Sequence, residues 1–173
     1  MHDLAYFALI FLAALLVRQF LFEPVRVKGS SMRSTLFNGE IMLVTKADVR
    51  LAGAQRQDVI ICKYPGRYID KWKVFPQYFV KRLIGLPGDT VSIEEGVVHI
   101  NGQPLDEPYL DPAHTRRRRS MEPVTLGEDE YFVLGDNRDS SNDSRSIGPI
   151  PRRMLVGRVR AVFFPFRAIR RIR

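Results

Sequence analysis

Two residues in this chain have the types and surroundings for peptide-bond or ester hydrolysis without a histidine base: Ser31 and Lys81. Ser31 lies in the short segment GSSM, and Lys81 lies in the apolar segment YFVKRLIGLPGD. Burial among the apolar residues on both sides of the lysine would disfavour its charged form. A neutral lysine amine is a base, and a serine hydroxyl beside a base is a nucleophile. If the fold brings the two together, the chain is a serine hydrolase.

The histidines and the cysteine exclude other kinds of chemistry. His2 precedes an apolar segment, His99 is beside a turn, and His114 adjoins an arginine run, so none is placed as the base of a serine triad. Cys62 is the only cysteine, so an intramolecular disulfide, a thiolate zinc site or a redox pair cannot form within the chain. We therefore expect no metal and no cofactor.

Length and charge set broader limits. A chain of 173 residues is long enough for one domain with a hydrophobic core. Its formal net charge of +8 and pI of about 10.0 favour contact with phosphate, in nucleic acid or in anionic lipid headgroups. Charge alone does not choose between them.

The apolar segment from Leu4 to Phe22 has about the length needed to cross a bilayer. Arg18 interrupts it near the end, where its side chain can reach the membrane interface. The alternatives are a buried core helix or the apolar part of a cleaved signal sequence, although the segment lacks the basic start and small-residue cleavage site of the latter. We predict a transmembrane anchor over residues 1–22, followed by a domain over residues 23–173. The arginines after the anchor would place that domain in the cytoplasm by a simple positive-inside count, but the rule weakens for long translocated domains.

The rest of the chain favours β structure. Strands are predicted within residues 40–47, 58–64, 90–100 and 130–135, which are rich in β-branched and aromatic residues, and turn signals separate them. Asn101-Gly102 after 97–100 predicts a hairpin with a type I′ turn. The expected fold is mainly β, an antiparallel sheet or barrel-like domain that follows one N-terminal helix.

Two polar stretches are predicted outside the core. Residues 104–123 contain four prolines and the run Arg116–Arg119, and are predicted to form an exposed loop, either simply solvated or in contact with lipid phosphate or an acidic partner. Residues 66–76 mix aromatic and basic side chains, a pattern that fits single-stranded nucleic acid, a membrane surface or ordinary packing. Next to an anchor, we favour the membrane surface or packing.

Three segments, in order after the apolar stretch, resemble the motifs of type I signal peptidase. They are VKGSSMRSTL at 27–36, KRLIGLPGD at 81–89 and GDNRDSSNDSRSIG at 135–148. The resemblance extends from Leu4 to about Phe166. It implies a membrane-bound serine endopeptidase that removes signal peptides from exported preproteins.

The resemblance also implies catalytic roles. Ser31 would be the nucleophile, with its backbone N–H as one oxyanion donor, and Lys81 would be the general base. The second donor would come from Gly29, which has no hydroxyl, so only its backbone is available. Only about one unperturbed lysine in a thousand is neutral near pH 7.5, so Lys81 needs a pKa lowered by about two to three units. Burial and a neighbouring cation such as Arg82 could supply this shift.

The third segment would supply supporting residues. Ser141 matches the serine that hydrogen-bonds the lysine amine, and Asp143 and Arg145 match a charged pair that braces the site. A metal loop is the alternative, but the acidic residues do not have the ligand spacing of a calcium loop.

Two positions depart from the family pattern. Ser34 stands where a proline is usual, and Gln57 replaces the glycine of an Arg-Gly-Asp sequence. We expect a less restricted backbone at the first position and an altered turn at the second.

The residues that flank the catalytic pair are candidates for contacting substrate. They are Val27, Met32, Leu36 and Val80, and ordinary core packing is the alternative for each. An extended signal peptide could add as a strand beside them. The partners implied are signal peptides and the lipid bilayer, without nucleic acid, and the catalytic domain would lie on the outer face of the cell membrane on a single-pass anchor.

Two other functions remain open. One is a specialised peptidase that matures a single pilin-like or conjugation substrate. The other is a non-catalytic, membrane-anchored basic protein that binds nucleic acid or lipid.

Overall fold

The computed structural model describes residues 6–7, 9–11, 22–47, 49, 53–72, 74 and 76–172. Most of the predicted anchor, from Leu4 to Phe22, lies outside these residues. Within the described part of the chain, no helix has the length and apolar character needed to span a membrane.

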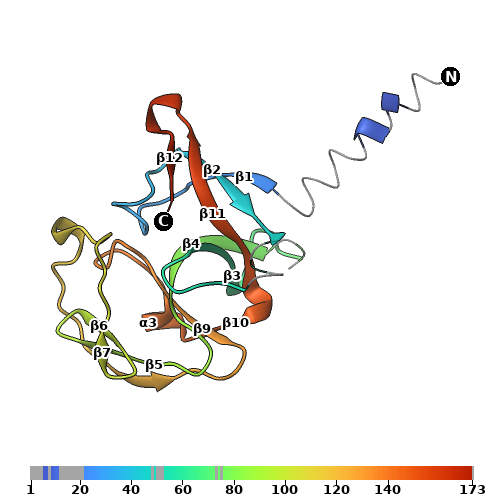
Figure 1. Cartoon of the computed structure of the whole chain (residues 1–173). Helices are drawn as coiled ribbons and strands as arrows, with labels where there is room; N and C mark the ends of the chain where they lie inside the picture. The colour runs from blue at the N-terminus through green and yellow to red at the C-terminus, as the bar shows by residue number, and fades with distance from the viewer. Residues whose placement is uncertain are drawn as a thin grey trace.

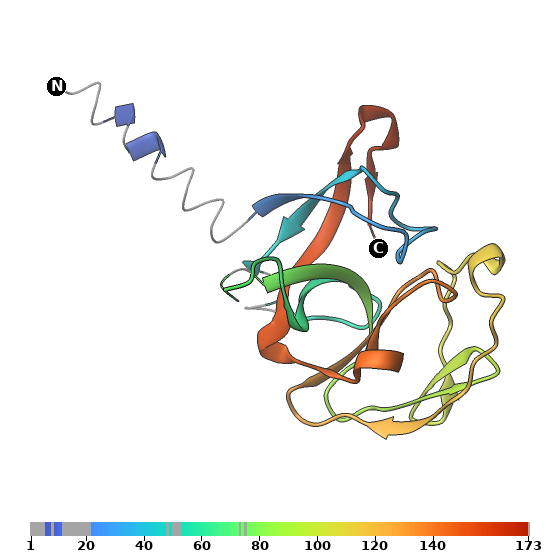
Figure 2. The same cartoon turned by 180° about the vertical axis from the view of Figure 1, so that it is seen from behind.

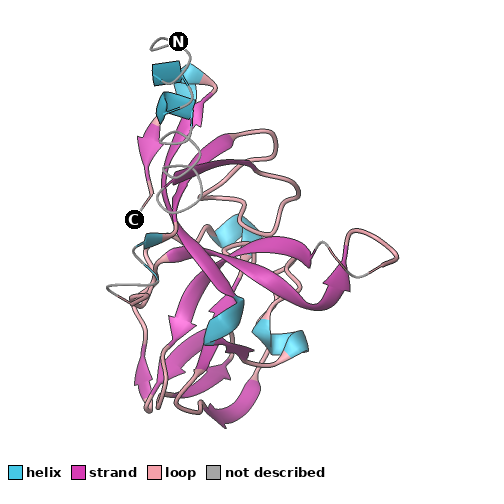
Figure 3. Ribbon diagram, turned by 90° about the vertical axis from the view of Figure 1, so that its right-hand side faces the viewer, coloured by secondary structure: helices cyan, strands magenta, loops and turns pink. Residues whose placement is uncertain are grey.

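The described strands form two antiparallel sheets (Figures 1 and 3). The larger sheet has the order β1 (Phe22–Arg26), β2 (Ile41–Thr45), β11 (Leu155–Phe164), β3 (Val59–Tyr68), β4 (Pro76–Gly85), β9 (Glu130–Leu134) and β10 (Ile150–Pro151), with β12 (Arg170–Arg171) paired to β11. The smaller sheet has the order β7 (Gln103–Pro104), β6 (Val97–Ile100), β5 (Thr90–Glu94) and β8 (Met121–Thr125). The described helices are short: α3 (Ser144–Ile147) and the 3-10 turns η1 (Pro112–His114), η2 (Arg152–Met154) and η3 (Phe166–Ala168).

The two sheets occupy opposite ends of the domain. The smaller sheet lies far from β1 and β12 in both views (Figures 1 and 2). One apolar cluster packs beneath β1, β2 and β11 and includes Met32 and Leu36, while another joins the smaller sheet to the ends of β4 and β9. Strand β4 belongs to the larger sheet but also contributes Ile84 to the second cluster, so it connects the two ends.

The predicted mainly β fold is confirmed, and each predicted strand segment contains an observed strand. The predicted type I′ hairpin turn is also confirmed, because β6 and β7 pair across Asn101 and Gly102, whose φ angles are 51° and 79°. The strands that were not predicted include β1, β4, β8 and β11. Strand β11 contains Gly157, Arg158 and Arg160, which interrupt the apolar alternation that marks a strand.

The stretch 104–123 is only partly exposed. The side chains of Arg116–Arg119 are exposed, but Glu107 and Tyr109 turn inward. The carboxylate of Asp139 accepts hydrogen bonds from the backbone N–H groups of Arg116 and Arg117, at 3.0 and 2.8 Å. The arginine run is therefore held against the segment 135–148.

Candidate active site

Ser31 lies in a tight turn between β1 and β2. This turn is held from outside by Asn137, whose backbone N–H donates to the Ser31 carbonyl oxygen at 3.0 Å. The Asn137 side-chain amide donates to the carbonyl oxygen of Ser30 at 3.1 Å. Two segments more than 100 residues apart in the sequence are thereby fixed to each other, and the orientation of Ser31 depends on both.

Lys81 lies on β4 and its side chain reaches Ser31. Its Nζ atom is 2.8 Å from Ser31 Oγ and donates to the carbonyl oxygen of Val80 at 3.0 Å. The lysine is only 3% exposed, and its amine stands 5.2 Å from the centre of the Phe79 ring. The predicted pair is thus within hydrogen-bond distance in a largely dry environment.

The surroundings of Lys81 lower its pKa to about 8. Burial is the main cause, because it removes water from the ammonium form, and the positive charge of Arg145 acts in the same direction. Asp143, Cys62 and Asp136 oppose the shift. With a pKa of about 8, roughly a quarter of the amine is neutral near pH 7.5, instead of about one part in a thousand.

Asp143, which is fully buried, and Arg145, which is partly buried, form an ion pair beside this amine. Arg145 Nε donates to Asp143 Oδ1 and Arg145 Nη2 to Asp143 Oδ2, both at 2.8 Å. Asp143 is fully buried and also accepts from the backbone N–H of Gly135 at 3.0 Å. These bonds keep the carboxylate ionised and lower its pKa, although burial opposes them.

Arg82 faces the opposite side of β4 from Lys81. Its guanidinium donates to both carboxylate oxygens of Asp136, at 2.9 and 2.7 Å, and lies 3.7 Å from the centre of the Tyr109 ring. Arg82 and Asp136 are almost completely buried. The nearby cation that lowers the lysine pKa is therefore Arg145, while Arg82 anchors the residue that precedes Asn137.

Ser141 is close to the site, but the predicted hydrogen bond to the lysine amine is not present. Its Oγ atom is buried and lies close to the Asp143 carboxylate, whose pKa it helps to lower, but it makes no well-aligned hydrogen bond with a described residue. The side chain packs on the backbone of Gly135. Its hydroxyl is thus a buried polar group with unused hydrogen-bonding capacity near Ser31 and Lys81.

The backbone N–H of Gly29, the predicted second oxyanion donor, is engaged elsewhere. It donates to Asn38 Oδ1 at 3.1 Å. The φ angle of Gly29 is +95°, in the region that only glycine adopts readily. Gly29 therefore shapes the turn before Ser31, and its N–H would have to leave Asn38 to face an oxyanion.

A groove of about 710 Å³ opens beside Ser31 and Lys81. Its lining includes Val27, Met32 and Val80, three of the four residues for which substrate contact is predicted. Leu36 does not line it, and its prediction as a substrate-binding residue is wrong. Its side chain is 1% exposed in the core, because the turn directs it inward beneath Ser31.

Sequence reasoning missed much of this lining. The additional residues are Val25, Arg26, Lys28, Ile61, Tyr64, Arg67, Ile69, Gln77, Tyr78, Phe79 and Asn142. Several come from β3 and the first half of β4, and only the antiparallel pairing of these strands places them near Ser31. The aromatic and basic mixture in 66–76 was the available signal, and part of it lies at the rim of the groove.

The first half of β4 offers a strand edge to the groove. β9 pairs with β4 only from Arg82 onward, so among the described strands the residues before Arg82 pair with β3 alone. Unpaired backbone groups on such an edge can bind an extended peptide.

The two residues that depart from the family pattern, Ser34 and Gln57, both have positive φ angles. Ser34 has a φ of 99°, which a proline ring cannot adopt, and Gln57 has a φ of 69°, a conformation that glycine adopts more easily. The turn at Gln57 thus keeps a backbone form suited to glycine, with a strain of about 1 kcal/mol or more for a residue with a Cβ.

The carboxylates of segment 135–148 already have hydrogen-bond partners within the protein. Asp136 and Asp143 bind arginine, and Asp139 binds backbone N–H groups. In the described part of the chain, no group of three or more His, Cys, Asp or Glu side chains could hold a metal ion.

Comparison with known proteins places this arrangement in context. The family model described as "Signal peptidase, peptidase S26" matches residues 2–164. The chain is 41% identical over 167 residues to a signal peptidase I of Bacillus licheniformis, covering 91% of this chain and 85% of that protein. It is 39% identical to signal peptidase I T of Bacillus subtilis, covering 92% and 82%. A solved signal peptidase I of Enterococcus faecalis V583 is 35% identical, with a TM-score of 0.47, and the match covers 61% of this chain and 95% of that one.

Proposed function

The chain belongs to the peptidase S26 family of signal peptidases, and from this premise we propose that Ser31 and Lys81 form its catalytic dyad. It is a serine endopeptidase that cleaves signal peptides. The observation that supports the dyad is the 2.8 Å distance between Lys81 Nζ and Ser31 Oγ, combined with a lysine pKa of about 8.

The proposed reaction begins with proton transfer from Ser31 Oγ to the neutral amine of Lys81. Oγ attacks the carbonyl carbon of the scissile peptide bond, and the resulting oxyanion accepts a hydrogen bond from the Ser31 backbone N–H. The ammonium then gives its proton to the leaving nitrogen as the carbon–nitrogen bond breaks. Lys81 next takes a proton from water, which hydrolyses the ester on Ser31, and it returns that proton to Oγ.

The other buried polar residues position this dyad. Asp143 and Arg145 are a neutralising pair, so Lys81 experiences little net charge from them, and the ammonium formed during the reaction lies near a carboxylate. The Ser141 hydroxyl lies beside the dyad, close to Asp143, and we assign to it the role of turning toward the lysine amine when substrate enters. Gly29 and Ser31 are the proposed oxyanion donors, with the Gly29 N–H released from Asn38 on substrate binding.

The groove supports an extended substrate. A peptide strand beside the first half of β4 would direct alternate side chains into the pocket formed by Val27, Met32 and Val80. Because these apolar side chains already fill the floor of the groove, small side chains fit best next to the scissile bond. Small residues before the cleavage site are a property of signal peptides.

Membrane attachment completes the proposal. Residues 1–22 serve as a single-pass anchor, and the domain over 23–173 lies on the outer face of the cell membrane. The anchor keeps the groove where the apolar segment of a signal peptide ends, which raises the effective concentration of substrate without new contacts. Partition of the full chain into membranes, and loss of that partition when residues 1–21 are removed, would test this part.

The function is tested with purified full-length protein in detergent and a preprotein substrate. Mass spectrometry of the products identifies the bond cleaved. We expect cleavage after the signal peptide by the wild type and by the Ser30→Ala variant, and no detectable cleavage by Ser31→Ala. Ser30 is a matched control because it is the adjacent serine and its side chain makes no hydrogen bond in the described structure. Cleavage by Ser31→Ala at the wild-type rate would exclude Ser31 as the nucleophile, and a panel of preproteins distinguishes a general from a specialised peptidase.

A further inference from the structure

Asn137 holds the two peptide groups on either side of the Ser31 Cα atom. Its side-chain amide donates to the carbonyl oxygen of Ser30 at 3.1 Å, and its backbone N–H donates to the carbonyl oxygen of Ser31 at 3.0 Å. Asn137 is only 6% exposed, so water competes little for these bonds. One residue of a distant segment therefore fixes both the peptide group before the nucleophile and the peptide group after it.

The first of these peptide groups contains the Ser31 N–H, which is the oxyanion donor of the proposed reaction. A peptide group is planar and trans, so its C=O and N–H point in opposite directions. A hydrogen bond that fixes the direction of the Ser30 carbonyl thus also fixes the direction of the Ser31 N–H. This N–H has no hydrogen-bond partner among the described residues, so it is available to an oxyanion.

The Ser30 carbonyl oxygen accepts a second hydrogen bond, from the backbone N–H of Arg33 at 3.1 Å. That bond is local to the turn, whereas the bond from Asn137 joins the turn to segment 135–148. Both lone pairs of the oxygen are therefore used. Hydrogen bonds to a carbonyl polarise its peptide group, which makes the N–H of the same group a stronger donor.

The orientation of the Asn137 amide is fixed by its other end. Its Oδ1 atom accepts from the backbone N–H of Ser140 at 3.1 Å, and only an oxygen can accept there, so the NH₂ group must face Ser30. The preceding residue, Asp136, accepts a hydrogen bond from Thr35 Oγ1 in the turn that begins at Ser31. Two consecutive residues thus hold this turn.

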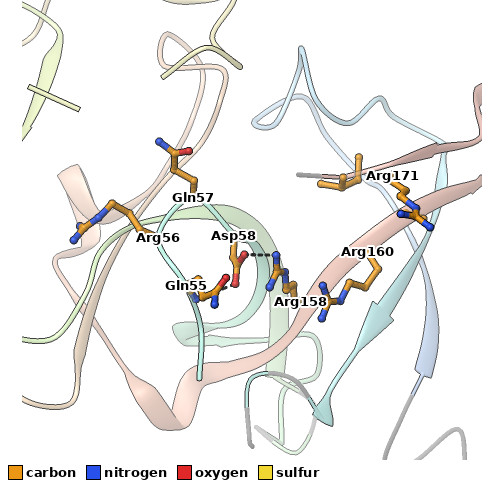
Figure 4. A pocket seen from close by; sticks show the side chains of 9 residues that line it. Gln55, Arg56, Gln57, Asp58, Arg158, Arg160 and Arg171 are labelled. Carbon is orange, nitrogen blue, oxygen red and sulfur yellow. Dashed lines mark hydrogen bonds and ion pairs between the residues drawn. The ribbon is translucent and has the colours of Figure 1, made fainter. Parts of the chain in front are cut away.

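The support of Asn137 extends away from the site. Arg82, which binds Asp136, also donates to the carbonyl oxygen of Gln57 at 2.8 Å. Gln57 lies in the loop before β3, and Asp58 ties that loop to Arg158 of β11 at 2.7 Å (Figure 4). The segment that carries Asn137 is therefore anchored to the larger sheet, and Asn137 can hold Ser31 in a fixed orientation.

We propose that Asn137 is a positioning residue of the oxyanion site, which directs the Ser31 N–H toward the oxyanion by holding the carbonyl of Ser30. This inference rests on the proposed function, in which Ser31 is the nucleophile. Asn137 does not line the groove beside Ser31, so it acts through the peptide group between Ser30 and Ser31. A donor that is already oriented stabilises the oxyanion without reorganisation at the moment of reaction.

Asn137→Ala removes the bond to Ser30 and is expected to lower kcat by about tenfold to 100-fold, since complete loss of one oxyanion donor costs about 100-fold to 1,000-fold. KM for a signal-peptide substrate should change less than about threefold, because this donor acts mainly as the oxyanion forms. Both constants are measured with purified full-length protein in detergent, below the unfolding temperature of the variant. An unchanged kcat, or a loss that appears only in KM, would overturn the proposal.

The pH profile separates an effect on the oxyanion from an effect on Lys81. The acid limb of kcat/KM should keep its wild-type midpoint in Asn137→Ala, because that midpoint belongs to Lys81 and an asparagine carries no charge. A shifted midpoint that accounts for the lost activity would overturn the proposal.

Asn101→Ala is the matched structural control. Asn101 also joins two segments through its side chain and its backbone, with two hydrogen bonds to Thr90 at 2.8 Å, but it lies in the hairpin of the smaller sheet. This variant should lower the unfolding temperature without lowering kcat. A loss of kcat equal to that of Asn137→Ala would contradict the proposal.

A peptide aldehyde of the substrate sequence tests the oxyanion site directly. Ser31 Oγ forms a bond to the aldehyde carbon, the Oγ proton passes to Lys81, and the C=O electron pair remains on the oxygen as an oxyanion. The matching peptide alcohol cannot form this bond. Asn137→Ala should weaken inhibition by the aldehyde by about tenfold or more and inhibition by the alcohol by less than about twofold. Equal changes for the two inhibitors would overturn the proposal.

A second variant is used if Asn137→Ala folds poorly. Asn137→Asp keeps the acceptor for Ser140 but has no donor for Ser30, so the same losses in kcat and in aldehyde inhibition are expected. Cleavage by the wild type but not by Ser31→Ala establishes the proposed function independently. A wild-type kcat in both Asn137 variants would then overturn this inference alone.

Discussion

Gly135 packs directly against the carbonyl oxygen of Ser31. A Cβ atom at position 135 would stand 2.5 Å from that oxygen and 2.6 Å from the Cβ of Ser141, and it would meet the Ser141 hydroxyl even more closely. Backbone oxygen cannot move out of the way without moving Ser31. The close approach of two distant segments at the site thus requires a residue without a side chain.

Gly135→Ala is therefore expected to displace Ser31 or Ser141 and to lower kcat/KM by about 100-fold or more, since misplacement of a reacting group by about 1 Å has effects of that size. Steady-state cleavage of a signal-peptide substrate measures it. Gly127→Ala is the matched control, because its Cβ would meet only Glu130 at ordinary contact distances of 3.4 Å and longer. Similar activity in the two variants would show that the close packing at Gly135 is not needed.

Arg145 contributes to the low pKa of Lys81. Its charge lowers that pKa, so Arg145→Gln should raise it and move the acid limb of the pH profile to higher pH. Arg145→Lys keeps a positive charge beside Asp143 and should leave the midpoint closer to that of the wild type. The pH dependence of kcat/KM for both variants provides the measurement. A Gln variant whose midpoint is unchanged or lower would contradict this role.

Arg145→Gln should also destabilise the domain. Asp143 is fully buried, and removal of its partner leaves an unpaired buried charge, which costs about 3–5 kcal/mol. Thermal unfolding monitored by circular dichroism at pH 7 measures this loss, and the Lys variant should recover part of it.

Lys81 should reduce the stability of the fold at neutral pH. Its folded pKa of about 8 lies below the ordinary lysine value of 10.5, so the unfolded chain binds the proton more tightly. Stability therefore rises with pH between about 8 and 10.5, and the full penalty, about 3 kcal/mol, applies below pH 8. We expect Lys81→Met to be more stable than the wild type at pH 7 by up to this amount, with a smaller difference at pH 10. Lys63→Met, an exposed lysine on β3, is the control and should show no such pH-dependent gain.

The groove should favour acidic residues near the cleavage site. Arg26, Lys28 and Arg67 are exposed at its rim, and none of its described lining residues is Asp or Glu. Peptides with Asp or Glu flanking the small residues should have a kcat/KM a few-fold above that of peptides with Lys at the same positions, because exposed pairs contribute about 0.2–1 kcal/mol each. The preference should fall with added salt and shrink in Lys28→Gln but not in Lys63→Gln. Equal rates for acidic and basic peptides would count against it.

Much of the fold could be predicted from local patterns. The strands with alternating β-branched residues and the Asn101-Gly102 turn were visible in the sequence, because period-two patterning and positive-φ turn residues are local signals. Strand β11 was not, since its arginines line a cavity formed with distant segments. The pattern of neighbouring residues does not show which distant segments will surround a strand.

For the candidate site, the proximity of Ser31 and Lys81 could be predicted, but the hydrogen bonds that hold them could not. Ser31 and Lys81 were predicted from their motifs and from the apolar residues around the lysine. The hydrogen bond from Asn137 to Ser31 and the one from Gly29 to Asn38 depend on the paths of loops, which local sequence does not show. Leu36 was misassigned because proximity in sequence to Ser31 does not determine which way a side chain points. Local sequence also does not show which cation lowers the pKa of Lys81. Strand β4 directs the Arg82 side chain away from Lys81, and the cation near Lys81 is Arg145.

The most direct test of the dyad is the pH dependence of kcat/KM between pH 6 and 10, measured for the wild type on a signal-peptide substrate without ionisable side chains near the bond. kcat/KM reports the ionisation of the free enzyme, so it should rise about tenfold per pH unit and level off above pH 8, where Lys81 is neutral. Lys81→Met should abolish this cleavage at every pH, while Lys63→Met should follow the wild type. A flat profile from pH 6 to 9, or wild-type cleavage by Lys81→Met, would contradict a mechanism in which Lys81 activates Ser31.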